Sequence, residues 1–477
     1  MLTKSSATVR KRIYLHRHFF ILYFIYVFFG AVLYFALPQR QLDRGVTPFM
    51  EHGFFDLDEN LDRVALIDDG EESIALRLDL IAGAEKTLEI SYHSLHKGVV
   101  AELFYGAIFE AADRGVQVRI VMDGIFHRLY GTMKDLKYML KAHPNIEFRL
   151  YEPFHFYRPW RWNNRLHDKM MIVDGRIGLI SGRNIGDRYH LTEDFTREFV
   201  LDLDVVVSTD RQENPHSAVS QMGEYFTELW EHPFTQEMGF FFNSRKEKRG
   251  EALRTAFMER LRRARSEYPE YVISATGLLE ERSIPVRRIR LIHNPITRGK
   301  KEPWVWASLV YLAGEAHHSI TVQSPYIIPT RGMLHYLEEE FLEGKEVTLL
   351  TNSLASSPNL FGVAGYKGKR RFLADWATEI WEYYGPGSLH GKCVLYDDHL
   401  SAVGSFNMDA RSSFLSTETM LVIDSAEFNS HLQNVVQKHA RYSQPILASK
   451  RTPTAPWHKR IMVGAARLFG WFMDYLL

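Results

Sequence analysis

Two stretches of the chain carry the same pattern: LHDKMMIVDGRIGLISGRN at residues 166–184 and LHGKCVLYDDHLSAVGSFN at residues 389–407. A pattern that returns at one constant offset, here 223 residues, indicates an internal repeat. The residues that match are His167 with His390, Lys169 with Lys392, Asp174 with Asp397, and Asn184 with Asn407. The repeat therefore predicts two similar halves.

Each copy is preceded by strand and helix patterns in alternation. Apolar, β-rich runs at 84–94 and 316–326 each lead through a helix-like stretch to a second β-rich run. The helix-like stretches are 101–115 and 333–344, and the strands that follow them are 116–124 and 345–353. Strand, helix and strand in this order are typical of βαβ units with parallel strand pairs. The sequence therefore predicts an α/β fold made of two related halves.

Within each signature the spacing predicts a β-hairpin. Asp174-Gly175 is a strong two-residue turn between the apolar runs MMIV and RIGLIS. Residues two apart on a strand point to one face, so His167 and Lys169 share a face. With a two-residue turn His167 faces Gly182, and Asn184 lies further along on that face. The second signature repeats this arrangement, with Asp397-Asp398 as the turn, His390 facing Ser405, and Asn407 on the His/Lys face.

These residue types suit a phosphodiester substrate. Lysines and amides can hold the non-bridging oxygens and the charge that develops on them. One neutral histidine can attack phosphorus, and the other, when protonated, can donate a proton to the leaving alcohol. No carboxylate cluster for a divalent metal is required, because the lysines supply the positive charge. The turn positions of Asp174 and Asp397 favour a structural role for both.

Composition limits the classes of function. The 477 residues include 58 Lys plus Arg and 58 Asp plus Glu, a formal net charge of zero, which weighs against general binding of nucleic acid. The chain has a single cysteine, Cys393, so an intrachain disulfide is impossible and a multi-thiolate metal site is excluded. Cys393 points away from the Lys392 face and is expected in the core. His93 and the remaining histidines show no ligand-like arrangement.

The two ends of the chain suggest contact with a membrane. Residues 19–37 carry no charge and are long enough to cross a bilayer. Five basic residues precede this stretch and two follow it, which places the N-terminus in the cytoplasm and the rest outside. Bulky residues at its end favour an uncleaved anchor over a signal peptide. Residues 457–477 have one apolar helical face, either amphipathic and interfacial or docked on the core.

The resulting organisation has six parts. Between the halves lies a charged, helix-rich connector whose charge run is typical of a solvated helix face. The parts are a basic tail (1–18), a transmembrane helix (19–37), a first α/β domain (45–210), a helical connector (211–300), a second α/β domain (301–445) and an amphipathic tail (446–477).

The doubled H-x-K-x-x-x-x-D pattern, each copy followed by a Gly/Ser-rich turn and Asn, resembles the phospholipase D superfamily over most of residues 60–445. Stretches such as HPNIEFRLYEPF, SGRNIGDRY, QSPYIIP and AGYKGKRRFL look like the bacterial cardiolipin synthase branch, especially its C type. This resemblance implies a sandwich-like α/β fold for each half and one active site at their pseudo-twofold interface. It also implies phosphatidyl transfer through a covalent histidine, without metal or cofactor.

The same resemblance assigns roles to individual residues. The catalytic set would be His167, Lys169, Asp174, His390, Lys392 and Asp397, with Asn184, Ser405 and Asn407 binding substrate. An acidic residue downstream of each motif is expected to orient a histidine. Glu418 fits this role in the second half, and in the first half Asp204 fits best with Asp202 as the alternative. Ser181-Gly182 departs from the usual Gly-Ser or Gly-Gly order, so the first motif lacks the hydroxyl of Ser405.

Three classes of function follow from these observations. The first is a membrane-anchored phosphatidyltransferase of the bacterial cytoplasmic membrane, acting on phosphatidylglycerol, alone or with phosphatidylethanolamine. The second is a phosphodiesterase of the same superfamily that hydrolyses phospholipid or, less in keeping with the charge, nucleic acid. The third is a non-catalytic membrane protein with a relic fold, which two intact signatures disfavour.

Overall fold

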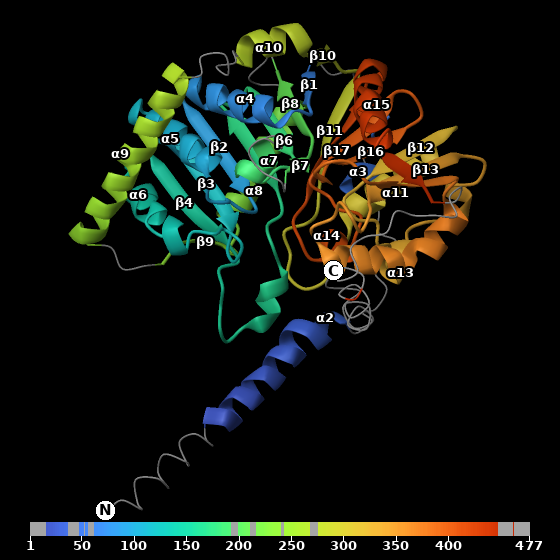
Figure 1. Ribbon diagram of the computed structural model, residues 1–477, viewed down its shortest axis with the longest axis horizontal. Coiled ribbons are helices and arrows are strands. Elements are labelled where there is room, and N and C mark those ends of the chain that lie inside the picture. The colour runs from blue at the N-terminus through green and yellow to red at the C-terminus, as the bar shows by residue number, and fades with distance from the viewer. Residues whose placement is uncertain are drawn as a thin grey trace, which may run out of the picture.

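Two mixed β-sheets, one from each half of the chain, form the framework of the molecule (Figure 1). The computed structural model describes residues 16–36, 47–51, 53–55, 62–191, 199–209, 216–239, 243–267, 275–446 and 461. Within each sheet the strands before a signature pair in parallel, and the signature itself adds an antiparallel hairpin. The predicted α/β class with two similar halves is confirmed.

The first sheet has nine strands and the second has eight. In spatial order the first contains β10 (Ile284–Pro285), β1 (Arg63–Ile67), β8 (Asp204–Ser208), β6 (Ile177–Ser181), β5 (Lys169–Val173), β2 (Thr87–Tyr92), β3 (Gln117–Asp123), β4 (Ile146–Tyr151) and β9 (Thr235–Glu237). The second contains β11 (Arg288–His293), β18 (Thr419–Asp424), β17 (Leu400–Gly404), β16 (Lys392–Tyr396), β12 (Ser319–Gln323), β13 (Glu346–Asn352), β14 (Glu379–Tyr383) and β19 (Ser443–Pro445). From β1 and β11 onward the two orders correspond strand for strand, as the repeat predicts.

Helices cover the outer faces of both sheets and also fill the space between them. The main helices of the first half and the connector are α4 (Gly70–Ala82), α5 (Val99–Asp113), α6 (Leu136–Ala142), α8 (Ala218–Glu231), α9 (Ser244–Glu267) and α10 (Ala275–Arg282). Those of the second half are α11 (Trp304–Glu315), α13 (Leu360–Trp376) and α15 (Ala426–Ala440). One apolar core joins α8 and α15 with side chains of both sheets, such as Val205 and Leu421. This shared core holds the two halves against each other.

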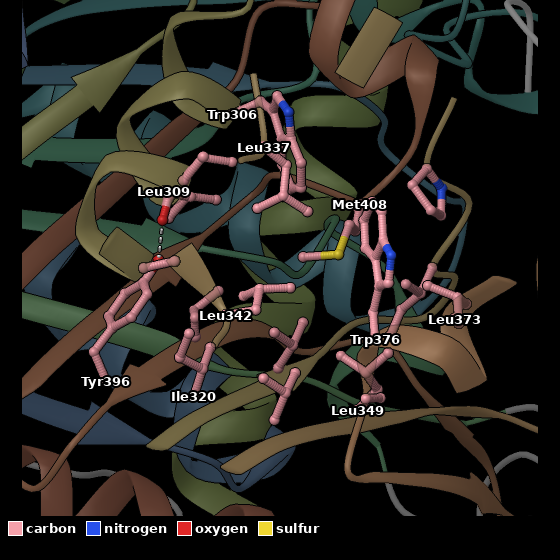
Figure 2. A pocket seen from close by; sticks show the side chains of 18 residues that line it. Trp306, Leu309, Ile320, Leu337, Leu342, Leu349, Leu373, Trp376, Tyr396 and Met408 are labelled. Atoms are coloured by element: carbon pink, nitrogen blue, oxygen red, sulfur yellow. Dashed lines mark hydrogen bonds between the residues drawn. The ribbon is translucent and has the colours of Figure 1, made fainter. Parts of the chain in front are cut away.

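The core of the second half encloses a small apolar cavity of about 90 Å³ (Figure 2). Trp306 and Leu309 of α11, Trp376 of α13, and Leu349 and Tyr396 of the sheet line it. The Tyr396 hydroxyl turns out of the cavity and donates to the Leu309 carbonyl at 2.8 Å.

The segment 211–300, expected as a helical connector, contains α8, α9 and α10 and also contributes to both sheets. Its strands β9 and β10 extend the first sheet, while β11 pairs with β18 in the second. The charged helix α9 packs on α5 and α6 through Phe257 and Leu261 and leaves most of its charged side chains exposed.

Two local expectations are corrected by the structure. The helix expected over 333–344 is instead α12 (Arg331–Leu334) followed by a 3₁₀ turn, Glu339–Phe341. The Trp306 indole donates to the Met333 carbonyl at 2.8 Å and so takes an acceptor that a longer helix would use.

Both hairpin turns hold three residues rather than two, because Val173 pairs with Ile177 and Tyr396 with Leu400. The strand register therefore differs by one from the expected one.

The N-terminal apolar helix, residues 16–36, leaves the lower edge of the body in Figure 1. It contains a π-helical segment, Phe28–Leu33, and ends in the short α2 (Tyr34–Ala36). Within the described residues, His16–Leu33 is long and apolar enough to cross a membrane, and little of it is buried by the protein. Most of the tail at 446–477 lies outside the described residues.

Candidate active site

The two signatures meet at the interface between the halves because short strand segments pair across it. β7 (Val200–Leu201) of the first half pairs in parallel with β15 (Ser388–Leu389) of the second. On the pseudo-symmetric side, Arg165 forms a parallel bridge with Ser416. Each pairing joins the segment just before a signature histidine to the segment just before the acidic residue of the other half.

As a result, each histidine contacts an acid from the opposite half. Nδ1 of His167 lies 2.9 Å from the Glu418 carboxylate, and Nδ1 of His390 lies 2.5 Å from Oδ2 of Asp202. The exposed fractions of the two histidine side chains are 17% and 18%, whereas both acids are fully buried. With Nδ1 held by a carboxylate, Nε2 of each ring is the nitrogen left for chemistry.

The expectation that Asp204 orients a histidine is wrong, and its alternative Asp202 has that position. Asp204 forms a buried ion pair with Arg77, Nη1 to Oδ2 at 2.8 Å, and accepts hydrogen bonds from Ser73 and Ser181. It occupies the sheet position that Met420 has in the second half, since Ser181 pairs with Asp204 and Gly404 with Met420. Asp204 therefore stabilises the core of the first half.

The glycine–serine difference between the motifs has a steric cause. A Cβ atom at Gly182 would lie 2.0 Å from Oδ1 of Asp202, so no side chain fits beside that carboxylate. At the corresponding site Ser405 donates its hydroxyl to Oε2 of Glu418 at 2.5 Å. Glu418 therefore has a hydroxyl group beside it, whereas Asp202 occupies the space that the corresponding side chain would need.

Lys169 and Lys392 are buried beside the histidines. Their ammonium groups donate to the carbonyl oxygens of His167 and His390, respectively, and Nζ of Lys392 also lies 2.7 Å from Nδ1 of His390. Burial lowers the pKa of Lys169 to about 7 and that of Lys392 to about 8. A bound phosphodiester anion would favour the charged form of both. The two buried lysines therefore favour the binding of an anion at this site.

The electrostatics of the two histidine–acid pairs differ. Burial and then the Lys169 ammonium hold the pKa of His167 well below its usual range. Burial raises the pKa of Glu418 to about 7, against the effect of Lys169. Burial and Lys392 lower the pKa of His390 to about 4, while Asp202 opposes them. Burial acts to raise the pKa of Asp202, but Lys392 and His390 outweigh it and depress that pKa strongly.

The two asparagines of the signatures contact nearby side chains. The Asn184 amide donates to the Tyr189 hydroxyl at 3.2 Å, and the Tyr189 ring lies 5.7 Å from the His390 ring. The Asn407 backbone N–H donates to Ser412 Oγ at 3.3 Å. Within the described parts of the chain, the side-chain oxygens of both asparagines are buried without a hydrogen-bond partner. Both amides therefore keep polar capacity for a ligand.

Asp174 and Asp397 lie at the far ends of their hairpins, away from the histidines. Each has a positive φ, 53° and 50°, and each carboxylate accepts backbone N–H bonds at the start of a neighbouring strand. The donors are Glu85, Lys86 and Thr87 for Asp174, and His317, His318 and Ser319 for Asp397. The structure places both aspartates in the scaffold of their hairpins, as their turn position suggests, and does not bring them together with the histidines.

Sequence reasoning gave no role to His93, which lies beside the site. Its ring centre lies 5.1 Å from that of His167, and its Nδ1 donates to the Leu166 carbonyl at 2.6 Å. Burial and then His167 hold the pKa of His93 well below its usual range, so its imidazole is neutral. The available signal was its position directly after β2, which pairs with β5. Cys393, expected in the core, is buried there.

The fold and the paired signatures define a two-domain member of the phospholipase D superfamily. The family model described as "Cardiolipin synthase, PLD-like domain" matches residues 78–230 and 309–440, more than half of the chain. The chain belongs to this family, and the predicted resemblance and enzyme class are confirmed.

Relatives and a solved structure agree with this assignment. Cardiolipin synthase C of Escherichia coli (strain K12) is 26% identical over 481 residues, covering 87% of this chain and 94% of the relative. Cardiolipin synthase of Geobacillus thermodenitrificans (strain NG80-2) is 25% identical, covering 85% and 71%. An uncharacterized protein of Helicobacter pylori (strain ATCC 700392 / 26695) is 24% identical, covering 79% of each. Phosphatidylserine synthase of Haemophilus influenzae Rd KW20 shares the fold, with a TM-score of 0.62 at 13% identity over 88% of this chain and 98% of that chain.

Proposed function

We propose that this enzyme is a membrane-anchored phosphatidyltransferase of the cardiolipin synthase type that works through a phosphohistidine. The observation that carries the proposal is the crossed pair of contacts, His167 with Glu418 and His390 with Asp202, flanked by two buried lysines. Two imidazoles held by opposite halves, with Nε2 of each available, supply a nucleophile and a proton donor for one phosphodiester.

The reaction would run in two displacements. Nε2 of His167 attacks phosphorus, the bond from phosphorus to the lipid alcohol breaks, and His390 gives its proton to that leaving oxygen. In the second step His390 takes the proton of an incoming alcohol, whose oxygen attacks phosphorus while the P–N bond breaks. Lys169 and Lys392 offset the negative charge on the non-bridging oxygens in both steps. The two half-reactions leave the enzyme unchanged and use no external oxidant or metal.

Transfer to a lipid alcohol must compete with water at about 55 M, so the acceptor has to be held in place. Effective molarities of ~10⁵ M or more are attainable for a well-positioned nucleophile. The basic stretch of α13, with Lys369 and Arg370, lies on the edge of the molecule from which the apolar helix leaves (Figure 1), which supports a role in holding the anionic headgroup of that second lipid. Tyr366, first considered as an interfacial residue of this stretch, is instead buried and contacts Glu382.

The apolar helix supports an anchor in the cytoplasmic membrane. The excess of basic residues before it favours an N-terminus inside and catalytic halves outside. A reporter fused after Leu477 should be active on the outer side only. Activity of that reporter in the cytoplasm alone would reverse the proposed topology.

Purified enzyme given phosphatidylglycerol, alone or with phosphatidylethanolamine, should form cardiolipin as the major product. Chromatographic analysis of the lipids measures it, and the reaction should continue in EDTA. Lys369→Ala with Arg370→Ala should shift product towards phosphatidic acid, whereas Lys248→Ala with Arg262→Ala on the exposed face of α9 should not. Phosphatidic acid as the main product of the unmodified enzyme would leave a phospholipase, and loss of activity in EDTA that a divalent ion restores would refute the two-histidine mechanism.

A further inference from the structure

An aromatic loop, residues 154–160, projects from the first half beside the apolar helix (Figure 1). It connects β4 to the segment that leads into the His167 signature. Four of its large side chains are exposed to an unusual degree: Phe154 at 56%, Phe156 at 42%, Tyr157 at 70% and Trp160 at 40%. Exposed aromatic side chains gathered in one short segment mark an interaction site.

Specific contacts join the aromatic loop to the apolar helix. The Tyr23 and Tyr26 hydroxyls donate to the Phe156 and Tyr157 carbonyls at 3.0 and 2.8 Å, and the rings of Tyr23 and Phe156 stack at 4.2 Å. Nearer the body, the Asn163 amide donates to the Ala31 carbonyl at 2.6 Å. From Tyr23 to Ala31 the loop follows ~12 Å of helix at 1.5 Å per residue.

The helix is shaped for this contact at Gly30, within its π-helical segment. A Cβ atom at Gly30 would lie 2.8 Å from Cγ of Pro159, so only glycine allows this approach without a shift. Segments of π-helix are frequent at functional sites. The loop and the helix therefore fit each other closely, and Phe24 and Phe28 of the helix are exposed as well.

The inner end of the loop is firmly held and lies close to the catalytic centre. Arg161 forms a buried ion pair with Glu152 at 2.6 Å, and Arg165 pairs with Asp123 at 3.1 Å. His167 is four positions after Asn163, so their Cα atoms are at most ~14 Å apart. The residue that contacts the helix is therefore close to the catalytic histidine along the chain.

We propose that the aromatic loop enters the lipid together with the apolar helix and so holds the entrance of the active site against the bilayer. The occupant is a bilayer, because the loop continues the exposed apolar surface of the one helix in the described chain that could span it. Exposed aromatic rings suit contact with lipid, and the long side chain of the exposed Arg158 can extend its guanidinium towards polar headgroups. This inference rests on the proposed membrane function but not on the reaction catalysed.

Site-specific fluorescence tests the insertion. Cys393 is buried, so a polarity-sensitive thiol probe can report from a single introduced cysteine, Tyr157→Cys. The matched control is Glu281→Cys on α10, exposed on the side of the molecule opposite the apolar helix (Figure 1). In vesicles of phosphatidylethanolamine and phosphatidylglycerol that carry brominated acyl chains, the probe at 157 should be quenched and the probe at 281 should not.

Two further experiments test the proposal that the loop enters the lipid. The same quenching should be seen in a His167→Asn background, so failure of the proposed reaction leaves this test intact. Phe156→Ser with Tyr157→Ser should raise KM for vesicle substrate about tenfold or more while activity on a soluble short-chain lipid stays the same. A probe at 157 that remains in water in vesicles, or that cross-links to a second copy of the chain with no quenching by lipid, would overturn the proposal.

Discussion

The two histidine–acid pairs occupy equivalent places in the two halves, yet they differ in chemistry. His167 faces a glutamate that accepts a hydroxyl hydrogen bond from Ser405, and His390 faces an aspartate that fills the space above Gly182. Duplication alone would give two interchangeable pairs. The difference indicates that the site is polarised, with one histidine suited to attack and the other to proton transfer.

The electrostatics of the acids support the proposed roles. The strongly depressed pKa of Asp202 keeps its carboxylate charged at neutral pH, and this charge opposes burial and Lys392, which lower the pKa of His390 to about 4. A bound phosphodiester anion would add to the effect of Asp202 and favour the imidazolium that a proton donor needs. Burial raises the pKa of Glu418 to about 7, so its charge near His167 is weaker, and the neutral imidazole of a nucleophile is favoured. This difference supports the proposed order, in which His167 attacks and His390 transfers the proton.

Replacing either histidine should have the largest effect, and one substrate separates their roles. Steady-state transfer to a natural lipid should fall by about 10⁴-fold or more in His167→Ala and His390→Ala. On a phosphatidyl ester of p-nitrophenol, whose leaving group needs no proton, His390→Ala should still release about one nitrophenol per enzyme in a burst. His167→Ala should give no burst, as rapid-mixing absorbance measures.

The exposed His317 provides the control for this experiment, since His317→Ala should keep both the burst and the steady state. A burst in His167→Ala that is absent from His390→Ala would reverse the assignment. It would also show that the charge of the acid does not decide which histidine attacks.

Neutralising the acids should separate the pairs by a smaller margin. Asp202→Asn removes the charge that raises the pKa of His390, so kcat should fall by about 10²- to 10⁴-fold. Because a proton donor is active below its pKa, the alkaline limb of the pH–rate profile should move to lower pH. Glu418→Gln keeps a side-chain acceptor for His167 and should cost less than about tenfold. Equal losses in the two variants, measured as kcat against pH, would contradict the polarised site.

Exchanging the small residues beside the acids should have a further, smaller effect. Gly182→Ser places atoms where Asp202 lies and should displace that carboxylate, with a loss of kcat of about 10²-fold. Ser405→Gly removes one hydroxyl from Glu418 and should reduce kcat by less than about tenfold. Circular dichroism checks that both variants fold. An active Gly182→Ser enzyme would mean that the close approach to Asp202 is not needed.

The residues of the site that belong to the repeat could be predicted from the sequence. The two signatures lie at one offset and form hairpins on corresponding strands, so His167, Lys169, His390 and Lys392 could be named without a structure. The acids could not be placed in the same way. Asp202 follows Asn184 by 18 residues, whereas Glu418 follows Asn407 by 11, so the repeat loses its register between motif and acid.

The remaining errors arise because strand pairing and long-range contacts cannot be read from the sequence. In the sequence, Asp204 fits the expected acidic residue downstream of the motif as well as Asp202 does. The structure shows that Asp204 pairs with Ser181 in the sheet and forms an ion pair with Arg77. The role of the aromatic loop could not be predicted from the sequence, because it depends on the helix against which the loop packs. Contacts between segments more than 120 residues apart, such as Tyr26 with Tyr157, leave no periodicity in the sequence.

The hairpin aspartates should show no difference between the halves, and their effect should be on stability alone. Asp174→Asn and Asp397→Asn each weaken a carboxylate that accepts three backbone N–H bonds, at about 1 kcal/mol for partly exposed groups. Burial acts to raise the pKa of Asp397, but the N–H donors lower it overall. The stabilising effect of the Asp397 carboxylate is therefore full above the unfolded pKa of about 3.9 and is lost as the pH falls through the lower folded value.

Thermal unfolding of Asp397→Asn should differ from that of the unmodified chain at pH 7 and converge with it in strong acid, while kcat is unchanged. A large fall in kcat with an unchanged Tm would instead place Asp397 in the catalytic set, and the same result at Asp174 would extend that role to both halves.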